Sequence, residues 1–193
     1  RRLLYDAGLC ATHQATVPVI SVGNLTLGGT GKTPMVAWAC RTLLAAGRRP
    51  AIVSRGYRRK SPLSQPLLVS DGQTVFAFAD QAGDEPSELA RLLPGVPVAV
   101  CSRRVKACTM LTERGLCDCI VLDDGFQHWQ LARNADIVLV DSTLALEQMR
   151  LFPAGTLREP LAAVHRATAV VHTRAETGQH VDENERCVAR LAP

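Results

Sequence analysis

Short apolar runs recur along the chain, and several of them are separated by stretches whose apolar residues have helical spacing. The runs predict strands, because each is short, rich in Val, Leu or Ile and bounded by polar, Gly or Pro residues. The expected strands are Pro18–Val22, Ala51–Val53, Leu67–Val69, Val96–Val100, Cys119–Leu122, Ile137–Val140 and Ala169–His172. The expected helices are Thr33–Ala46, Glu85–Leu93 and Arg103–Arg114, the first and last followed by Gly47 and Gly115.

Several of these strands are continuously apolar, which is typical of strands buried on both faces of a parallel sheet. The alternation of strands and helices favours the same architecture. We therefore predict an α/β fold, with a mostly parallel sheet and helices on both faces. Residues 1–176 are predicted to form this domain. The polar residues 177–193 are predicted to be a linker or the start of a truncated C-terminal lobe.

The composition excludes several classes of protein. The 193 residues are 47% hydrophobic and 21% charged, which argues against a disordered or low-complexity chain. The seven cysteines form no C-x-x-C pair, so neither a zinc site nor a disulfide framework is predicted. A net charge of +4 is too small to indicate a nucleic-acid binder, but residues 41–60 hold seven cations and no acid. This basic segment predicts an anionic partner, or else a solvated loop.

A phosphate-binding loop lies between the first strand and the first helix. Residues Thr26 to Thr33 read Thr26-Leu27-Gly28-Gly29-Thr30-Gly31-Lys32-Thr33. Glycines let backbone N–H groups approach phosphate oxygens, and the helix N-terminus adds positive potential. Lys32 is then expected at the β- and γ-phosphates of ATP, and the Thr33 hydroxyl at Mg²⁺. Thr26 departs from the standard pattern, which begins with Gly. The motif refines the fold class to a three-layer P-loop NTPase type.

Two strands end in aspartate, and each fits the metal-binding strand that P-loop enzymes require. One ends in Asp123 and Asp124, and the other ends in Asp141. Spacing alone does not choose between them. The adjacent carboxylates of Asp123 and Asp124 are the chemically richer pair for holding Mg²⁺ and its water shell. Asp84 with Glu85, and Arg158 with Glu159, are weaker signals, since a helix N-cap and a loop brace explain them equally well.

In five ordered motifs over residues 18–160 the chain resembles tetraacyldisaccharide 4'-kinase, the lipid A 4'-kinase of Gram-negative bacteria. The motifs are Ser21 to Thr26 running into the phosphate loop, Ser54-Arg55-Gly56-Tyr57, Gly83-Asp84-Glu85-Pro86, Asp123 to His128, and Pro153-Ala154-Gly155 with Leu157 to Pro160. The family shares the Thr26 departure. The resemblance implies transfer of the γ-phosphate of ATP to the 4'-hydroxyl of a tetraacylated glucosamine disaccharide 1-phosphate, at the cytoplasmic face of the inner membrane.

The resemblance also implies roles for single residues. Lys32 and Thr33 serve ATP and Mg²⁺, and Asp123 and Asp124 organise the metal. Asp84 belongs to the catalytic apparatus that activates the sugar hydroxyl, and Glu85 lies beside it as a further metal residue. Arg104, Arg158 and Glu159 are expected at substrate or phosphate. The family is longer, and its N-terminal membrane helix and the C-terminal lobe with an Asp-His-His stretch have no counterpart here. The chain is therefore expected to be a fragment. The part of the basic segment from Arg48 to Lys60 is expected to face anionic lipids of the inner membrane.

Three functions other than the kinase are alternatives, and the sequence argues against the first two. Partitioning ATPases and metal-centre chaperones carry a second lysine where this chain has Leu27. A GTPase needs Asn-Lys-x-Asp after a late strand, where this chain has His172-Thr173-Arg174. A nucleotide-binding remnant without catalytic activity would bind ATP but transfer nothing.

Overall fold

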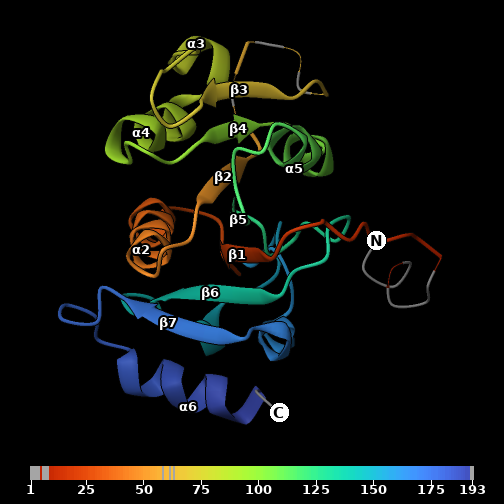
Figure 1. Cartoon of the computed structure of the whole chain (residues 1–193). Coiled ribbons are helices and arrows are strands. Elements are labelled where there is room, and N and C mark those ends of the chain that lie inside the picture. Colours follow the sequence, from red (N-terminus) through yellow and green to blue (C-terminus); the bar gives the residue numbers. More distant parts are fainter. Residues whose placement is uncertain (1–4, 6–8, 58, 61, 63, 192–193) are drawn as a thin grey trace.

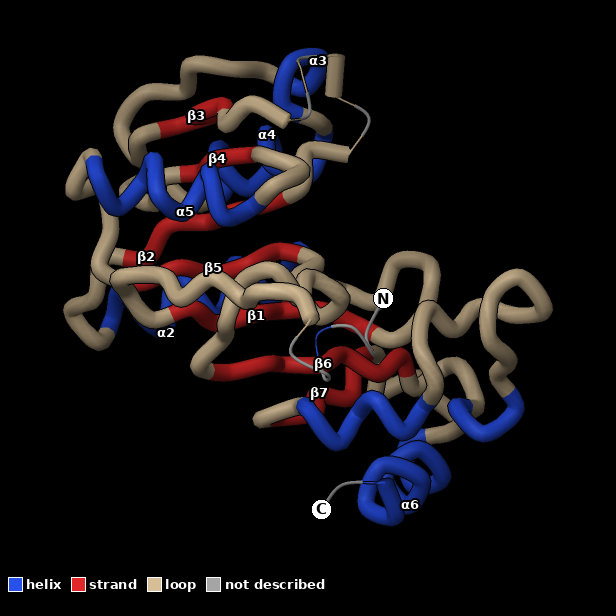
Figure 2. The backbone as a smooth tube through the Cα atoms, turned by 90° about the vertical axis from the view of Figure 1, so that its right-hand side faces the viewer, coloured by secondary structure: helices blue, strands red, loops and turns tan. Residues whose placement is uncertain are grey.

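A seven-stranded sheet forms the centre of the computed structural model, which describes residues 5, 9–57, 59, 60, 62 and 64–191. The strands are β1 (Val19–Asn24), β2 (Pro50–Ser54), β3 (Leu67–Ser70), β4 (Val98–Val100), β5 (Cys119–Asp123), β6 (Ala135–Asp141) and β7 (Ala169–Thr173). Their spatial order is β3-β4-β2-β5-β1-β6-β7 (Figures 1 and 2). All neighbouring pairs are parallel except β3 with β4.

Helices connect most of the strands. The α-helices are α2 (Lys32–Ala45), α3 (Ala79–Ala82), α4 (Asp84–Leu92), α5 (Arg104–Glu113) and α6 (Val181–Leu191), and the 3-10 helices are η1 (Leu146–Gln148) and η2 (Leu161–Arg166). In Figure 1, α2 and α4 lie on one side of the sheet and α5 lies on the other. This confirms the predicted mostly parallel sheet with helices on both faces.

The core is aliphatic and lies on both faces of the sheet. Alternate residues of each strand pack to opposite sides, so Ile52 packs beneath α2 and α4 whereas Ala51 and Val53 pack beneath α5. Two smaller clusters continue the core under η2 and α6, where Val140, Leu146 and Cys187 are buried together. The polar tail predicted after residue 176 thus contains helix α6. The buried Cys187 of this helix packs with Val140 of β6 and Leu146 of η1.

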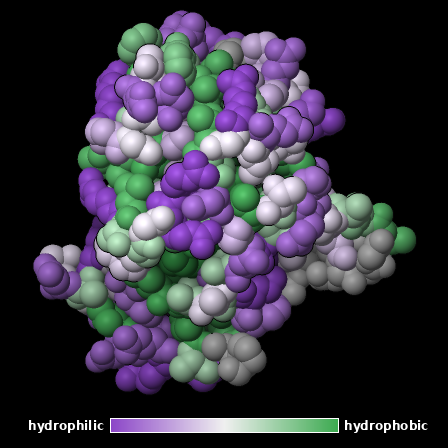
Figure 3. Space-filling model, in the orientation of Figure 1, coloured by the Kyte–Doolittle hydropathy of each residue, from purple (hydrophilic) through white to green (hydrophobic). Residues whose placement is uncertain are grey.

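The surface and the thiols complete the picture. Hydrophobic and hydrophilic residues are interspersed over the face seen in Figure 3, as is usual for a protein surface. Each cysteine is a free thiol, and all except Cys10 are buried. Burial raises the pKa of Cys40 and of Cys108 to about 12, so these thiols stay protonated. Among the described residues, no helix combines the length and hydrophobicity needed to span a bilayer.

Candidate active site

The phosphate loop lies where the sequence predicts it, between the carboxyl end of β1 and the start of α2. Gly31 precedes the helix with φ of 81°, a left-handed conformation that favours glycine. Asn24, at the end of β1, donates from Nδ2 to Thr30 Oγ1 at 2.8 Å. Leu27 donates its backbone N–H to the carbonyl of Thr156 at 2.7 Å. The loop is therefore held at both ends by chain segments outside it.

A cavity of about 490 Å³ opens beside this loop, and residues from five separate segments line it. They are Leu27, Gly28, Lys32, Ser54, Arg55, Tyr57, Glu85, Asp123, Asp124 and Arg158. The carboxyl ends of β1, β2 and β5 converge here because these strands are parallel neighbours. An open α/β sheet places its ligands at this edge. All five motifs thus meet around one cavity, to which they contribute Lys32, Arg55, Glu85, Asp123 and Arg158.

Asp124 is surrounded by cations. Arg158 Nη1 donates to its two carboxylate oxygens at 2.9 and 2.8 Å, and Lys32 Nζ lies 3.8 Å from Oδ1. Burial alone would raise the pKa of this carboxyl, but the hydrogen bond and charge of Arg158, together with Lys32 and Arg104, lower it overall. Asp124 is therefore ionised at neutral pH and forms the centre of a charged cluster next to the phosphate loop.

Asp123 has the opposite environment. It is only 2% exposed, and the hydroxyl of Ser54 donates to its Oδ2 at 2.9 Å. Burial raises the pKa of Asp123 to about 6, and the nearby carboxylates of Glu85 and Asp124 add to that rise, while the Ser54 hydrogen bond and Lys32 oppose it. Two adjacent aspartates therefore have pKa values shifted in opposite directions, which is typical of functional sites.

The donor set fits a magnesium ion. Asp123, Asp124 and Glu85 are mutually repelling carboxylates on one cavity, and a divalent cation would relieve that repulsion. Within the described part of the chain, no group of three or more His, Cys, Asp or Glu side chains is arranged to hold a metal by itself. Mg²⁺ normally needs only one or two carboxylates and completes its shell with water and phosphate oxygens.

Asp84 and Glu85 begin helix α4 but line different hollows. Glu85 lies on the phosphate-loop cavity, whereas Asp84 lies on a separate hollow of about 460 Å³ with Ser87, Glu88 and Arg91. Gly83 fixes the start of the helix, because its φ is 98° and a Cβ there would lie 2.7 Å from the carbonyl oxygen of Tyr57. Of the two acidic residues, only Glu85 thus lines the phosphate-loop cavity.

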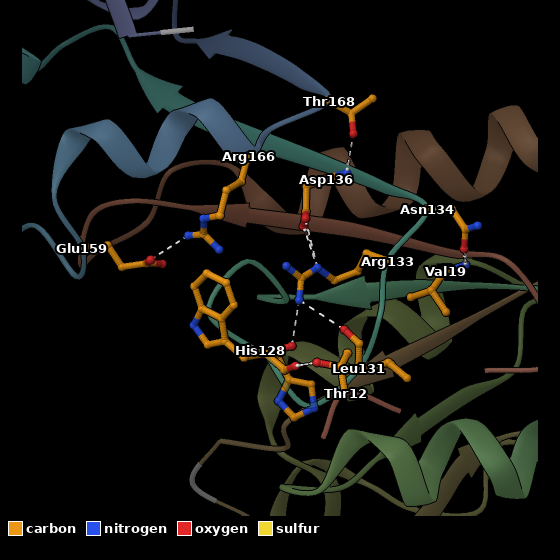
Figure 4. A network of polar contacts seen from close by, with 11 residues as sticks. Thr12, Val19, His128, Leu131, Arg133, Asn134, Asp136, Glu159, Arg166 and Thr168 are labelled. Atoms are coloured by element: carbon orange, nitrogen blue, oxygen red, sulfur yellow. Dashed lines mark hydrogen bonds and ion pairs between the residues drawn. The ribbon is translucent and has the colours of Figure 1, made fainter. Parts of the chain in front are cut away.

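Two of the expected substrate residues lie elsewhere. Arg104 is buried beneath the site and donates from Nη2 to the backbone carbonyl of Asp124 at 3.1 Å. Glu159 turns away from the cavity and accepts a hydrogen bond from Arg166 at 2.6 Å (Figure 4). The Arg166 guanidinium carbon lies 4.1 and 4.0 Å from the ring centroids of Phe126 and Trp129. These contacts make Arg104 and Glu159 supports of the site, because each holds a segment that carries a lining residue.

Asp141, the other strand-end aspartate, is closed off. Thr143 donates to its Oδ1 from the backbone at 3.0 Å and from the hydroxyl at 2.7 Å, and Arg174 forms an ion pair with Oδ2. Asp141 lines no part of the phosphate-loop cavity. Of the two strand ends that spacing left open, the one with Asp123 and Asp124 is therefore the one that lines the phosphate-loop cavity.

The basic segment at residues 41–60 does not form one surface. Arg48 and Arg49 lie at the amino end of β2, where Arg48 pairs with Asp118 at 3.3 Å. Arg55 follows the carboxyl end of the same strand and lines the cavity. Arg59 is buried and donates to the carbonyls of Val100, Pro62 and Gln65, so it braces the chain. Arg58 is outside the described residues. The cations of residues 48–60 therefore do not share one lipid-facing surface. Among the described residues, the exposed cations beyond the carboxyl end of β2 are Arg55 and Lys60.

Ser54, Arg166 and Arg174 were missed as site or support residues in the sequence. Ser54 carried a signal, since it begins the Ser54-Arg55-Gly56-Tyr57 motif. Arg166 and Arg174 carried none, because each is a single arginine outside the recognised motifs.

Comparison with known proteins places the chain in context. A model of the LpxK family, tetraacyldisaccharide-1-P 4'-kinase, matches residues 1–193. A tetraacyldisaccharide 4'-kinase from Desulfotalea psychrophila is 49% identical over 173 residues, which is 90% of this chain and 49% of the relative. One from Geobacter metallireducens is 49% identical over 174 residues, which is 90% of this chain and 51% of the relative.

A solved structure agrees with these relatives. The chain superposes on the crystal structure of LpxK from Aquifex aeolicus in complex with ATP with a TM-score of 0.84 and 42% sequence identity. The match covers 92% of this chain and 54% of that one. The chain thus spans about half the length of the relatives that it matches.

Proposed function

The chain belongs to the tetraacyldisaccharide-1-P 4'-kinase family, and from that premise we propose that it carries the ATP site of a lipid A 4'-kinase. The reaction is transfer of the γ-phosphate of ATP to the 4'-hydroxyl of a tetraacylated glucosamine disaccharide 1-phosphate. One observation carries the proposal: Lys32 of the phosphate loop and the Asp123–Asp124 pair face the same cavity at the carboxyl edge of the sheet.

The residues of the cavity divide the work of phosphoryl transfer. The backbone N–H groups of the loop and Lys32 hold the phosphate chain and neutralise charge on it. One or two of the carboxylates of Asp123, Asp124 and Glu85, together with the Thr33 hydroxyl, would hold Mg²⁺, which when bound supplies further neutralisation of the phosphate oxygens. Arg158 orients Asp124 through its two hydrogen bonds. Most of the catalytic effect then comes from positioning and electrostatics.

Asp84 is our assignment for the residue that receives the proton of the sugar hydroxyl. The hydroxyl oxygen forms a bond to the γ-phosphorus while the bond from that phosphorus to the bridging oxygen of ADP breaks. The proton leaves the attacking oxygen toward the Asp84 carboxylate. The place of Asp84 at the start of α4 supports this role, because the next residue, Glu85, lines the phosphate cavity.

A transfer assay tests the proposal. The complete gene product is incubated with ATP labelled at the γ-phosphate and the tetraacylated disaccharide 1-phosphate in micelles. We expect label in the lipid, and we expect Lys32→Ala to reduce the rate on the order of 10³-fold, because a charge at the transferring phosphate is lost. Lys106→Ala is the matched control, since Lys106 is exposed on α5 outside the cavity. ATP binding without transfer would instead identify a non-catalytic remnant, and a wild-type rate for Lys32→Ala would exclude this loop as the site.

The proposal extends to the membrane. The acyl chains of the acceptor stay in the bilayer, so the kinase works at the membrane surface and meets anionic lipids of the cytoplasmic face. Arg55 and Lys60 are exposed cations beyond the carboxyl end of β2. Each cation near an anionic leaflet adds about 1 kcal/mol, which salt screens. We expect Arg55→Gln/Lys60→Gln to sediment less with phosphatidylglycerol vesicles at low salt than Arg48→Gln/Arg49→Gln, which removes equal charge at the opposite strand end. Equal sedimentation of the two variants would remove Arg55 and Lys60 from the membrane contact.

A further inference from the structure

Arg174 links the end of β7 to the phosphate loop. Its guanidinium pairs through Nη1 with Asp141 and donates from Nη2 to the backbone carbonyl of Gly29 at 2.9 Å. Gly29 is 145 residues away in sequence and lies within the glycine run of the loop. No other described side chain is recorded as a donor to this carbonyl. The contact therefore joins the nucleotide site to a part of the sheet that does not line the cavity.

The geometry of a trans peptide gives this contact a directional consequence. The C=O of one residue and the N–H of the next lie in one plane and point in opposite directions. A donor that holds the Gly29 carbonyl outward therefore turns the N–H of Thr30 to the other side. Backbone N–H groups of a phosphate loop must point toward the phosphate oxygens to bind them.

The rest of the peptide is held as well. The Thr30 side chain is buried and accepts a hydrogen bond from Asn24 at 2.8 Å. The Gly29–Thr30 peptide is thus fixed from the carbonyl side by Arg174 and from the following residue by Asn24. Glycine on one side of this peptide makes it free to rotate without such contacts.

The backbone conformation of Arg174 indicates that more than a surface ion pair holds this residue in place. Its φ is 54°, in the left-handed region that residues other than glycine, asparagine and aspartate seldom adopt. Arg174 is 51% exposed, whereas its partner Asp141 is 5% exposed and is also held by Thr143. The buried carboxylate thus acts as a fixed anchor, and the strained residue reaches from it to the loop.

We propose that Arg174 is a positioning residue that orients the Gly29–Thr30 peptide so that the Thr30 N–H faces the phosphate chain of the nucleotide. The inference rests on the proposed function, because it concerns the same ATP site. A fork with several N–H donors is required, since Asp141 and Gly29 must be contacted together. A lysine has one compact charged group and does not reproduce a fork.

Binding measurements on the complete gene product test the proposal. Calorimetric titrations with MgATP and with inorganic tripolyphosphate give a Kd for each ligand, and circular dichroism gives the melting temperature. We expect Arg174→Ala to weaken both ligands about tenfold, the effect of one lost hydrogen bond to a charged oxygen. Arg174→Lys keeps a positive charge beside Asp141, and so retains the wild-type melting temperature, but is expected to weaken both ligands as well. Arg114→Ala, an exposed arginine at the end of α5, is the control and keeps the wild-type Kd.

The outcomes separate this inference from the proposed function. Wild-type affinity in Arg174→Lys and Arg174→Ala, with a wild-type chain that binds MgATP, overturns the role of Arg174 alone. Loss of MgATP affinity without loss of tripolyphosphate affinity also overturns it, because the residue would then act on the nucleoside. A wild-type chain that binds neither ligand overturns the proposed function and this inference together.

Discussion

Two strand ends flank the phosphate loop, and they share a sequence pattern but differ in environment. Strand β1 lies between β5 and β6, so Asp123 and Asp124 border it on one side and Asp141 borders it on the other. At the β5 end, the cations Lys32 and Arg158 approach Asp124 from the cavity. At the β6 end, the carboxylate of Asp141 forms an ion pair with Arg174 and accepts a hydrogen bond from Thr143.

The difference shows what makes an aspartate at a strand end available for chemistry. An apolar strand that ends in Asp brings a carboxylate to the ligand edge of the sheet in both cases. Only at the β5 end do the surrounding charges point into a cavity. At the β6 end, the carboxylate of Asp141 is instead bonded to Arg174 and Thr143, and these contacts hold the ends of β6 and β7 together. The function of a strand-end aspartate is therefore decided by its partners.

Substitution of the aspartates gives the largest expected effects. We expect Asp124→Asn to lower phosphoryl transfer on the order of 10²-fold and to raise the Mg²⁺ concentration needed for half-maximal rate, because an anion is lost from the cavity. Asp123→Asn should show a different Mg²⁺ dependence, since Asp123 is buried with a raised pKa whereas the cations around Asp124 lower its pKa. Asp141→Asn should weaken ATP binding through Arg174 but keep the wild-type Mg²⁺ dependence at saturating ATP. Rates measured across a Mg²⁺ titration check all three, and identical curves for Asp123→Asn and Asp124→Asn would make both residues merely structural.

The pH dependence of stability should also distinguish the two adjacent carboxyls. The pKa of Asp123 is about 6 in the folded protein and about 4 in the unfolded chain. The folded state therefore binds more protons between these values, and stability falls as pH rises through this window. The loss amounts to roughly 2–3 kcal/mol. Asp123→Asn cannot ionise, so it should not show this loss.

Asp124 supplies the control with the opposite sign. Its pKa is lowered in the folded state, so its contribution to stability is present above the unfolded pKa and is lost as pH falls. Guanidinium unfolding in EDTA at pH 4.5 and 7.5 measures both effects. Relative to wild type, Asp123→Asn should gain stability at pH 7.5, and Asp124→Asn should lose it. A gain in both variants would mean that Asp124 is not stabilised by its cations.

Much of the fold follows from local pattern. The continuously apolar runs predicted the strands that form the sheet, because burial on both faces leaves no polar alternation. The ends of several strands differ from the prediction by one or two residues. Strands β1 and β6, for example, continue to the polar residues Asn24 and Asp141. The short helix α3 was not predicted, since four residues carry too little periodicity to be recognised. Helix α6 lies in the segment that was predicted as a linker or as the start of a C-terminal lobe.

The site was predictable where its residues form motifs. Lys32 and Asp123 could be joined from the sequence alone, because parallel strands bring their carboxyl ends to one edge. The selection of Asp123 and Asp124 over Asp141 depended on Arg174, and the turn of Glu159 away from the cavity depended on Arg166. Such ion pairs are set by the packing of separate loops, and no local spacing encodes them.

The smallest expected effect concerns the hydroxyl groups that accompany the two strand ends. Ser54 donates to Asp123 at 2.9 Å in a buried setting, and Thr143 donates to Asp141 at 2.7 Å near the surface. Thr143→Val should lower the free energy of unfolding by about 1 kcal/mol, the usual value of one such hydrogen bond, and leave the Mg²⁺ dependence unchanged. Ser54→Ala should instead raise the pKa of Asp123 further, because its hydroxyl stabilises the ionised carboxylate. The Mg²⁺ requirement near pH 6 should then increase in Ser54→Ala. A changed requirement in Thr143→Val would connect Asp141 to the metal and would contradict the distinction between the two strand ends.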